Sequence, residues 1–335
     1  MSSSAQNVTR CTSREQVWRD ALLEREQQLF AKLTRLGDAP RRHLSARVSC
    51  LREDARTWLA LLPECSVHAV LTDPPYGLTE YHAREQRKLR AGCGGVWRIP
   101  PRFDGARRRP LPRFTVLSAR ELAVLEEFFG ALAGELLRVL VPGGHLLLAS
   151  NPLLSSLTFS AIQRAGLEKR GEIVRLAQTL RGGDRPKGAE REFADVAMMP
   201  RACWEPWGVF RKPLEGTAAE NLRRWGTGGL RRISAAQPFK DVIACPPARE
   251  PERRLAAHPS LKPQRLMRPL ARAVLPLGIG ILCDPFAGSG ATLAAAEHQG
   301  LCAIGTERDP VYFRLACGAF GALSRLRVSP GSPQR

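Results

Sequence analysis

Short runs of apolar residues recur along the chain and stop abruptly at acidic, proline or glycine residues. Three such runs cover residues 68–72, 278–283 and 301–306. They end at Asp73, Asp284 and Glu307 respectively. Apolar runs of this length, bounded by turn-forming residues, indicate buried strands. Because α/β sheets bind ligands beyond the carboxyl ends of their strands, these three ends are the first candidates for a functional site.

Helical periodicity alternates with the predicted strands. Apolar residues at helical spacing predict helices over residues 13–37, 53–62, 118–140, 154–165 and 291–298. Further apolar runs predict strands over residues 47–51, 145–150, 172–176 and 204–210, with a turn over 141–144. This alternation predicts an α/β fold with a mixed, mainly parallel sheet and helices on both faces. The apolar stripe of the first helix is expected to pack on its own domain, with a dimer face as the alternative.

Two prolines and a tyrosine follow Asp73. The prolines fix φ at about −65° and remove two backbone donors, so nearby carbonyl groups are left to accept from a ligand. Asp73 and the Pro74 carbonyl offer two acceptors to the exocyclic amino group of adenine or cytosine, and Tyr76 offers a ring that stacks on the base. The motif therefore predicts a site that makes this amino group reactive toward an electrophile.

The segment that follows Asp284 has the features of a cofactor loop. Gly288 and Gly290 fall at a strand-to-helix turn, where the backbone can approach a ligand closely. The N-terminus of the following helix favours an anion such as the carboxylate of an amino-acid-like cofactor. Glu307 ends the next predicted strand, close to the offset at which an acidic residue binds ribose hydroxyls. Together these features predict a cofactor that carries adenosine.

In this order the motifs resemble the β class of the DNA amino-methyltransferases, which use S-adenosylmethionine. The resemblance is carried by residues 73–76, by the block His-Pro-Ser-Leu-Lys-Pro at 258–263, by the loop 284–290 and by Glu307. It extends over about residues 45–320. It implies a Rossmann-like methyltransferase sheet in circularly permuted order, with the cofactor-binding half C-terminal to the catalytic half.

The resemblance also assigns roles to individual residues. It implies a catalytic motif of Asp73, Pro74, Pro75 and Tyr76. It implies cofactor binding by Asp54, Ser260, Lys262, Asp284, Pro285, Phe286, Ala287, Gly288, Ser289, Gly290, Thr292 and Glu307. Asp54 also suits the start of a helix, where an acidic side chain is a common structural feature. The expected reaction needs no metal.

The formal charge of +19 predicts a polyanionic partner and salt-sensitive binding. Double-stranded DNA fits this charge. Two segments without strong periodicity carry the candidate DNA-binding residues, which are Lys88, Arg90, Arg107, Arg108 and Arg109 in one and Arg223, Arg224, Arg231 and Arg232 in the other. A disordered, solvated loop is the alternative for the first segment, and a hairpin turn with solvated arginines for the second.

These observations divide the chain into consecutive regions. Residues 1–42 form a helical extension whose first dozen residues lack order, and residues 43–212 form the catalytic half with a basic insertion at 78–118. Residues 213–257 form a candidate target-recognition region. Residues 258–325 form the cofactor-binding half, and residues 326–335 a disordered tail.

The expected location is the cytoplasm, in association with the nucleoid. Nine cysteines occur without a Cys-x-x-Cys pair, and several fall in predicted strands, which indicates reduced thiols in the core. Arginine or proline interrupts the longest apolar stretches, and the first residues lack the pattern of a signal peptide. No membrane segment is therefore expected.

The expected function is site-specific methyl transfer from S-adenosylmethionine to adenine N6 in DNA, with the base extruded from the duplex. Cytosine N4 offers the same amino geometry, and charge alone does not separate DNA from RNA. From a different class, the chain could be a DNA-binding protein that keeps the fold without activity. A homodimer and a cognate restriction nuclease are left open as partners.

Overall fold

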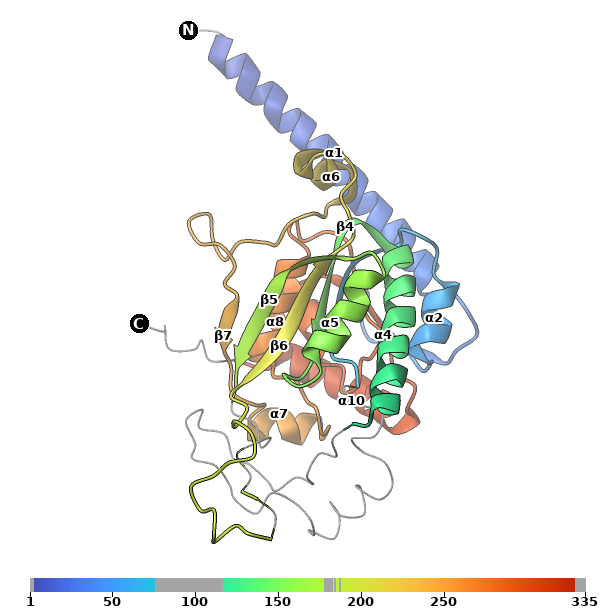
Figure 1. The fold of residues 1–335 in the computed structure, drawn as a ribbon. Coiled ribbons are helices and arrows are strands. Elements are labelled where there is room, and N and C mark those ends of the chain that lie inside the picture. Colours follow the sequence, from blue (N-terminus) through green and yellow to red (C-terminus); the bar gives the residue numbers. More distant parts are fainter. Residues whose placement is uncertain (1–2, 76–116, 178–182, 184, 187, 329–335) are drawn as a thin grey trace.

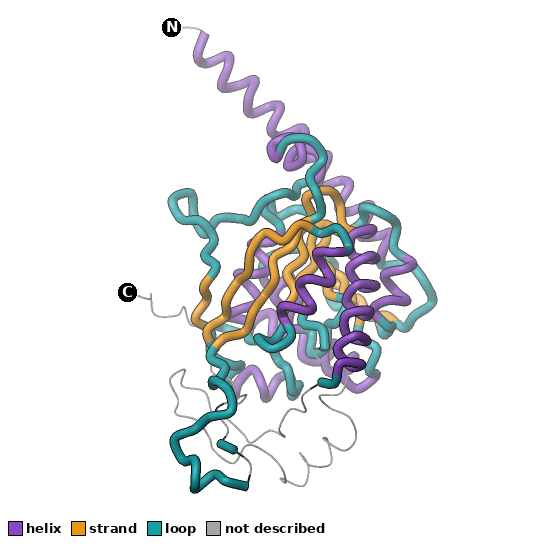
Figure 2. Tube along the Cα trace, viewed as in Figure 1, coloured by secondary structure: helices purple, strands orange, loops and turns teal. Residues whose placement is uncertain are grey.

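The computed structural model describes residues 3–75, 117–177, 183, 185–186 and 188–328, with side chains from residue 16 onward. Within these residues one sheet lies between two layers of helices (Figures 1 and 2). The strands are β1 (Arg41–His43), β2 (Val48–Leu51), β3 (Val67–Thr72), β4 (Leu140–Ala149), β5 (Glu168–Leu176), β6 (Trp204–Arg211), β7 (Val242–Ala244), β8 (Ile281–Asp284) and β9 (Cys302–Thr306). The helices are α1 (Ser3–Leu33), α2 (Ala55–Leu61), α4 (Ala119–Val139), α5 (Ser155–Arg164), α6 (Ala218–Trp225), α7 (Glu250–Leu255), α8 (Gln264–Val274), α9 (Ala291–His298) and α10 (Pro310–Arg325).

The described strands follow the order β1-β2-β9-β8-β3-β4-β6-β5-β7. The central strands from β2 to β4 are parallel, β6 is antiparallel to both of its neighbours, and β1 is antiparallel to β2. The sheet is therefore mixed and mainly parallel, as the sequence predicts. Strands β8 and β9, from the C-terminal half of the chain, insert between β2 and β3.

Side chains of the central strands alternate between two apolar layers. Leu71 and Leu147 pack in the layer that α8, α9 and α10 cover, whereas Val70 and Leu146 pack in the layer that α2, α4 and α5 cover. Parallel strands that are buried on both faces appear in the sequence as continuous apolar runs rather than alternating ones. This explains why residues 68–72 and 301–306 could be located from the pattern alone.

Helix α1 is longer than the sequence analysis predicted. It begins at Ser3, whereas the pattern placed its start at Ser13 and left residues 1–12 unordered. No glycine or proline interrupts this stretch, so nothing ends the helix once it has formed. Leu22 and Leu33 are buried against the domain and Val17 is exposed, so only the later part of the apolar stripe packs on its own domain. The first turns project away from the sheet (Figure 1).

Two further expectations were wrong. Residues 141–144 belong to β4 and not to a separate turn, because Gly143, with φ of +73°, bends the strand while its N–H donates to the Lys212 carbonyl at 3.1 Å. A short strand, β7, lies in the region where none was expected, and it pairs with the edge of β5 through Val174 and Val242. A strand of three residues is too short to leave a recognisable apolar pattern.

No helix of the described residues combines the length and apolar character needed to cross a membrane.

The approach of β8 to β3 depends on a glycine. Gly280 has φ of +118°, and a Cβ there would lie 2.6 Å from the His68 ring. His68 is buried and its Nδ1 accepts from the Ile281 N–H at 3.2 Å, so the ring has little freedom to move away.

We expect Gly280→Ala to lower the free energy of unfolding by about 3 kcal/mol, through backbone strain and overpacking. Gly134→Ala is the matched control, because no heavy atom lies within 4 Å of its added Cβ inside α4. The control should raise the free energy of unfolding by about 0.5–1 kcal/mol. Urea denaturation of both variants measures the difference, and equal stability of the two would contradict the packing described for β8.

Candidate active site

The two principal motifs lie at the carboxyl ends of adjacent parallel strands. Strand β3 pairs with β8 through Ala69 with Leu282 and Val70 with Cys283. Thr72 Oγ1 donates to Asp284 Oδ1 at 2.7 Å, although the two residues are 212 positions apart. The strand ends that carry Asp73 and Asp284 therefore open at the same edge of the sheet.

Asp284 is a buried carboxyl at this edge. Burial raises its pKa to about 6, while hydrogen bonds from the Thr292 and Thr72 side chains and from the Phe286 N–H act in the opposite direction. Asp284 thus fixes the beginning of the glycine loop to both β3 and α9. These three partners of Asp284 are hydroxyl and amide groups, and none of them is a cation.

The loop between β8 and α9 has the conformation that its glycines permit. Gly288 and Gly290 have φ of +50° and +76°, a region that other residues rarely adopt. The Ala287 N–H donates to the Thr306 carbonyl at 2.8 Å, which ties the loop to β9. Gly290 is the N-cap of α9 and offers no side-chain acceptor. The first N–H groups of α9 therefore have no side-chain cap and point toward the loop.

Glu307 follows β9 and meets the same loop. Its Oε2 accepts from the Gly288 N–H at 2.9 Å and its Oε1 from the Asp309 N–H at 2.8 Å. Burial raises the pKa of Glu307 above its usual range. A carboxylate has about four acceptor sites, so this half-buried group retains capacity for ligand hydroxyls.

Asp54 lies at this edge as a helix cap. Its Oδ1 accepts from the N–H groups of Arg56 at 3.0 Å and Thr57 at 3.4 Å, which caps α2. Its Oδ2 lies 3.9 Å from the guanidinium of Arg308, the neighbour of Glu307. The structural role considered for Asp54 is therefore present, and the residue also lies near the cofactor-loop candidates.

The segment before α8 holds the Asp73 carboxylate. Ser260 Oγ donates to Asp73 Oδ2 at 2.9 Å, and Lys262 Nζ lies 3.0 Å from the same oxygen. Lys262 Nζ also lies 3.1 Å from Glu205 Oε2 on β6. The structure thus brings Ser260 and Lys262, predicted as cofactor-binding residues, to the predicted catalytic carboxylate. Glu205 was not identified from the sequence, because no motif surrounds it.

His258 is a second residue that the sequence analysis did not single out. Its Nδ1 accepts from the Ser260 N–H at 3.1 Å, and its ring packs edge-on against Tyr312 at 4.4 Å between centroids. Burial lowers the pKa of His258, so the ring is neutral at pH 7 with its proton on Nε2. A Cβ on Gly288 would lie 3.3 Å from this ring. The sequence signal that could have identified His258 is its position as the first residue of the 258–263 block.

The remaining predicted residues fall into two groups. Tyr76, Lys88, Arg90, Arg107, Arg108 and Arg109 lie outside the described residues. Arg223, Arg224, Arg231 and Arg232 follow β6, which runs antiparallel to β4, so the chain leaves the sheet at the amino ends of the parallel strands. Asn221 of α6 donates to the Pro142 carbonyl at the start of β4, which fixes α6 at that far edge. These four arginines are therefore remote from Asp73.

The connection from β5 to β6 does lie at the Asp73 edge, since β6 is antiparallel to both β4 and β5. Part of it, residues 188–203, exposes apolar side chains. Phe193 is 43% exposed, Val196 47% and Met198 65%. Exposed apolar side chains gathered in one short segment indicate an interaction surface.

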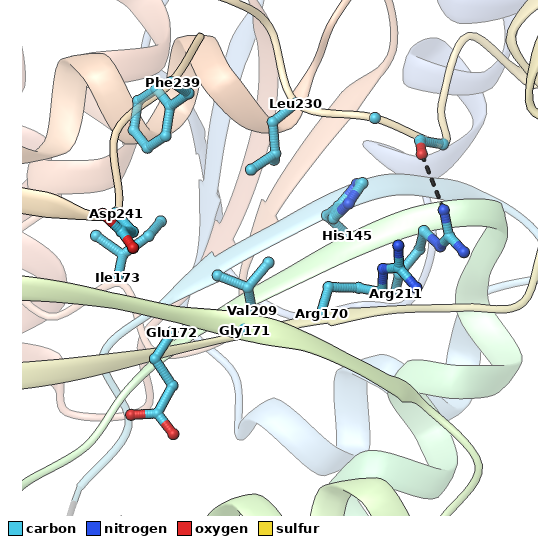
Figure 3. A pocket seen from close by; sticks show the side chains of 12 residues that line it. His145, Arg170, Gly171, Glu172, Ile173, Val209, Arg211, Leu230, Phe239 and Asp241 are labelled. Atoms are coloured by element: carbon cyan, nitrogen blue, oxygen red, sulfur yellow. Dashed lines mark hydrogen bonds between the residues drawn. The ribbon is translucent and has the colours of Figure 1, made fainter.

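A separate cavity of about 420 Å³ lies away from these residues (Figure 3). It lies between the amino-terminal part of β5 and the loop that carries Leu230 and Phe239. Burial and nearby arginines lower the pKa of His145, in its wall, to about 3. None of the predicted site residues lines this cavity, so it is not part of the candidate active site.

Comparisons with known proteins agree with the motif order. Residues 204–317 match a family model described as DNA methylase, of the N6 and N4 methyltransferases. The type II methyltransferase M.ScaI of Streptomyces caespitosus is 36% identical over 66 residues, which are 20% of this chain and 21% of that protein. The chain thus matches about a fifth of the length of that curated relative.

Two solved structures share the fold. TTHA0409, a putative DNA modification methylase from Thermus thermophilus complexed with S-adenosyl-L-methionine, has a TM-score of 0.51 and 21% identity, covering 83% of this chain and 94% of that one. The cytosine-N4-specific PvuII DNA methyltransferase has a TM-score of 0.57 and 15% identity, covering 85% and 90%. The chain is therefore similar to the DNA amino-methyltransferases in its ordered motifs and in residues 204–317, and it shares the fold of these two solved structures.

Proposed function

We propose that the protein transfers a methyl group from S-adenosylmethionine to adenine N6 in DNA. The observation that carries the proposal is the hydrogen bond from Thr72 to Asp284, which joins the strand end of the predicted catalytic motif to that of the predicted cofactor loop. Asp73 favours adenine over cytosine as the target base. In the family that this chain resembles, the members that methylate cytosine tend to carry serine at this position instead of aspartate. Cytosine N4 is the alternative target, since its amino group presents the same donors.

The cofactor-loop residues fit S-adenosylmethionine. The α9 N-terminus, which has no side-chain cap, suits the carboxylate of the amino-acid part, and Glu307 retains acceptor capacity for the ribose hydroxyls. Gly288 and Gly290 let the backbone come close to such a ligand. When bound, the cofactor supplies a methyl group on a positively charged sulfonium.

Asp73 and the Pro74 carbonyl would accept the two N–H groups of the target amino group. These acceptors favour a tetrahedral nitrogen, whose lone pair is no longer delocalised into the base ring and can attack. The Asp73 hydrogen bond strengthens as the nitrogen gains positive charge, so it stabilises the transition state more than the bound substrate. The proton leaves after methyl transfer. Tyr76 is predicted to stack on the base.

Double-stranded DNA is the proposed partner. The formal charge of +19 supports binding to a polyanion. The reaction requires the base to leave the duplex, and apolar side chains that insert between base steps are a common means of opening the stack. Phe193 and Met198 lie exposed at the Asp73 edge and suit that use. Homodimer formation, a cognate restriction nuclease, target recognition by residues 213–257 and a cytoplasmic, nucleoid-associated location stay predictions.

The first test compares the protein with Asp73→Ala. DNA from cells that express each version is sequenced by a method that reads modified bases, and purified proteins are assayed for single-turnover methylation and DNA binding. We expect N6-methyladenine only with the unchanged protein, and a rate lowered by about 10² to 10³ in Asp73→Ala with DNA affinity retained. Full turnover from a folded Asp73→Ala protein would refute the mechanism. Detection of N4-methylcytosine in place of N6-methyladenine would show that cytosine is the target base.

The second test addresses the cofactor loop. Gly288→Val should weaken S-adenosylmethionine binding by at least about tenfold, because a branched side chain is strained at φ of +50° and its Cβ would press on the His258 ring. Gly318→Ala is the control, since no heavy atom lies within 4 Å of that added Cβ. Calorimetric titration measures both affinities. Unchanged affinity in a folded Gly288→Val protein would remove the loop from the cofactor site.

The third test uses the pKa of Asp284, which burial raises to about 6. Because the folded-state value lies above the ordinary one, the folded state is favoured when this group is protonated. Its contribution to stability is complete below about pH 4 and is lost as pH rises through about 6. Between pH 5 and pH 7 the loss is about 1 kcal/mol.

Asp284→Asn should therefore show a smaller decrease in the free energy of unfolding between pH 5 and pH 7 than the unchanged protein. Chemical denaturation at the two pH values gives the four free energies needed. The same decrease in both proteins would show that Asp284 does not titrate in this range.

A further inference from the structure

Four buried charged side chains form a continuous series behind the candidate site. Lys262 Nζ lies 3.0 Å from Asp73 Oδ2 and 3.1 Å from Glu205 Oε2. Arg175 Nη1 lies 3.1 Å from the same Glu205 oxygen. All four side chains are between 5% and 15% exposed. Carboxylates and cations thus alternate from the sheet edge into β6 and β5.

The inner members of this series have further partners. Trp207 Nε1 donates to Glu205 Oε1 at 2.8 Å, and Arg175 donates to the carbonyl groups of Cys245 at 2.9 Å and Pro246 at 3.0 Å. Burial alone would raise the pKa of Glu205, but its two cationic neighbours hold it below the usual range, so it is ionised at neutral pH. Buried ion networks are weak sources of stability, whereas fully partnered ones fix geometry.

Asp73 is a residue whose orientation needs such support. The terminal torsion of an aspartate side chain is broad, so the backbone alone does not aim its acceptor oxygens. Ser260 Oγ and Lys262 Nζ both engage Oδ2, at 2.9 Å and 3.0 Å. Two contacts on one oxygen fix the plane of the carboxylate before a substrate arrives, which is the requirement for electrostatic preorganisation.

Resting on the proposed function, we propose that Lys262 is a positioning residue that orients the Asp73 carboxylate, and that Glu205, backed by Arg175, holds the Lys262 ammonium in place. A lysine ammonium is a compact charge on a flexible stem, so a second carboxylate is needed to fix its position. This role differs from the cofactor binding that the sequence resemblance implied for Lys262. The two roles predict different effects on rate and on cofactor affinity.

The test uses Lys262→Met, which keeps the length of the side chain and removes its charge, and Lys262→Arg, which keeps the charge. At saturating DNA and cofactor we expect Lys262→Met to lower the single-turnover rate by roughly 10- to 100-fold, since displacing a reacting group by about 1 Å costs on the order of 100-fold. Its affinity for S-adenosylmethionine by calorimetry should stay within about threefold of the unchanged protein. Lys262→Arg should be faster than Lys262→Met. Glu205→Gln should also have a lower single-turnover rate than the unchanged protein.

A double-mutant cycle shows whether Lys262 acts through Asp73. In an Asp73→Ala background, Lys262→Met should cause no further loss of rate, because the group that it orients is absent. An equal loss in both backgrounds would overturn the proposal, since Lys262 would then act independently of Asp73. A large loss of cofactor affinity with the rate retained at saturation would also overturn it, in favour of cofactor binding.

Arg211→Met is the control for general loss of an ion pair. Arg211 is 11% exposed and lies 2.6 Å from Glu168, at the far edge of the sheet. This variant should lose thermal stability without loss of methylation rate. If Arg211→Met lost as much rate as Lys262→Met, the Lys262 effect would reflect general loss of structure and the proposal would be overturned. Failure of the unchanged protein to methylate any nucleic acid would overturn the proposed function instead. The positioning role of Lys262 toward Asp73 would then fall with it.

Discussion

The parallel pairing of β3 with β8 is the constraint on which the candidate site depends. It brings together two strand ends from opposite halves of the chain, one with the predicted base-binding acceptor and one with the predicted cofactor loop. The buried hydrogen bond from Thr72 to Asp284 fixes their register. Because side chains alternate along a strand, a slip by one residue would turn the Thr72 hydroxyl to the other face and break that bond. The remaining site residues attach to this pair from β9, β6 and the segment before α8.

Two buried carboxyl groups at the same edge have pKa values that are shifted in opposite directions. Burial raises the pKa of Asp284, whose partners are hydroxyl and amide groups. Glu205 lies between Lys262 and Arg175, which hold its pKa below the usual range. The contacts of Asp284 are thus with neutral groups, whereas the charged surroundings of Glu205 place a cation next to Asp73.

The sequence predicted most of the fold and the strand ends that carry the motifs, because strands buried on both faces are continuous apolar runs and their turns are rich in proline and glycine. It did not predict the ion pairs of Glu205 and Arg175, since these depend on which strands become neighbours and on side chains that no local pattern marks. The sequence offered the arginines of residues 213–257 as DNA-binding candidates, which stays a prediction, but it could not show at which edge of the sheet they lie, because the direction of β6 is invisible in sequence. A single antiparallel strand sends the following segment to the other edge.

The strand order has a consequence for synthesis of the chain. Strands β2 and β3 are made early, yet the strands that separate them in the sheet, β9 and β8, are made after every other described strand. Until then β3 has an open edge with unpaired N–H and C=O groups, which is a template for pairing with other chains. The central sheet therefore closes only after β8 and β9 have been translated. Nascent protein at this stage is a natural substrate for chaperones that shield strand edges.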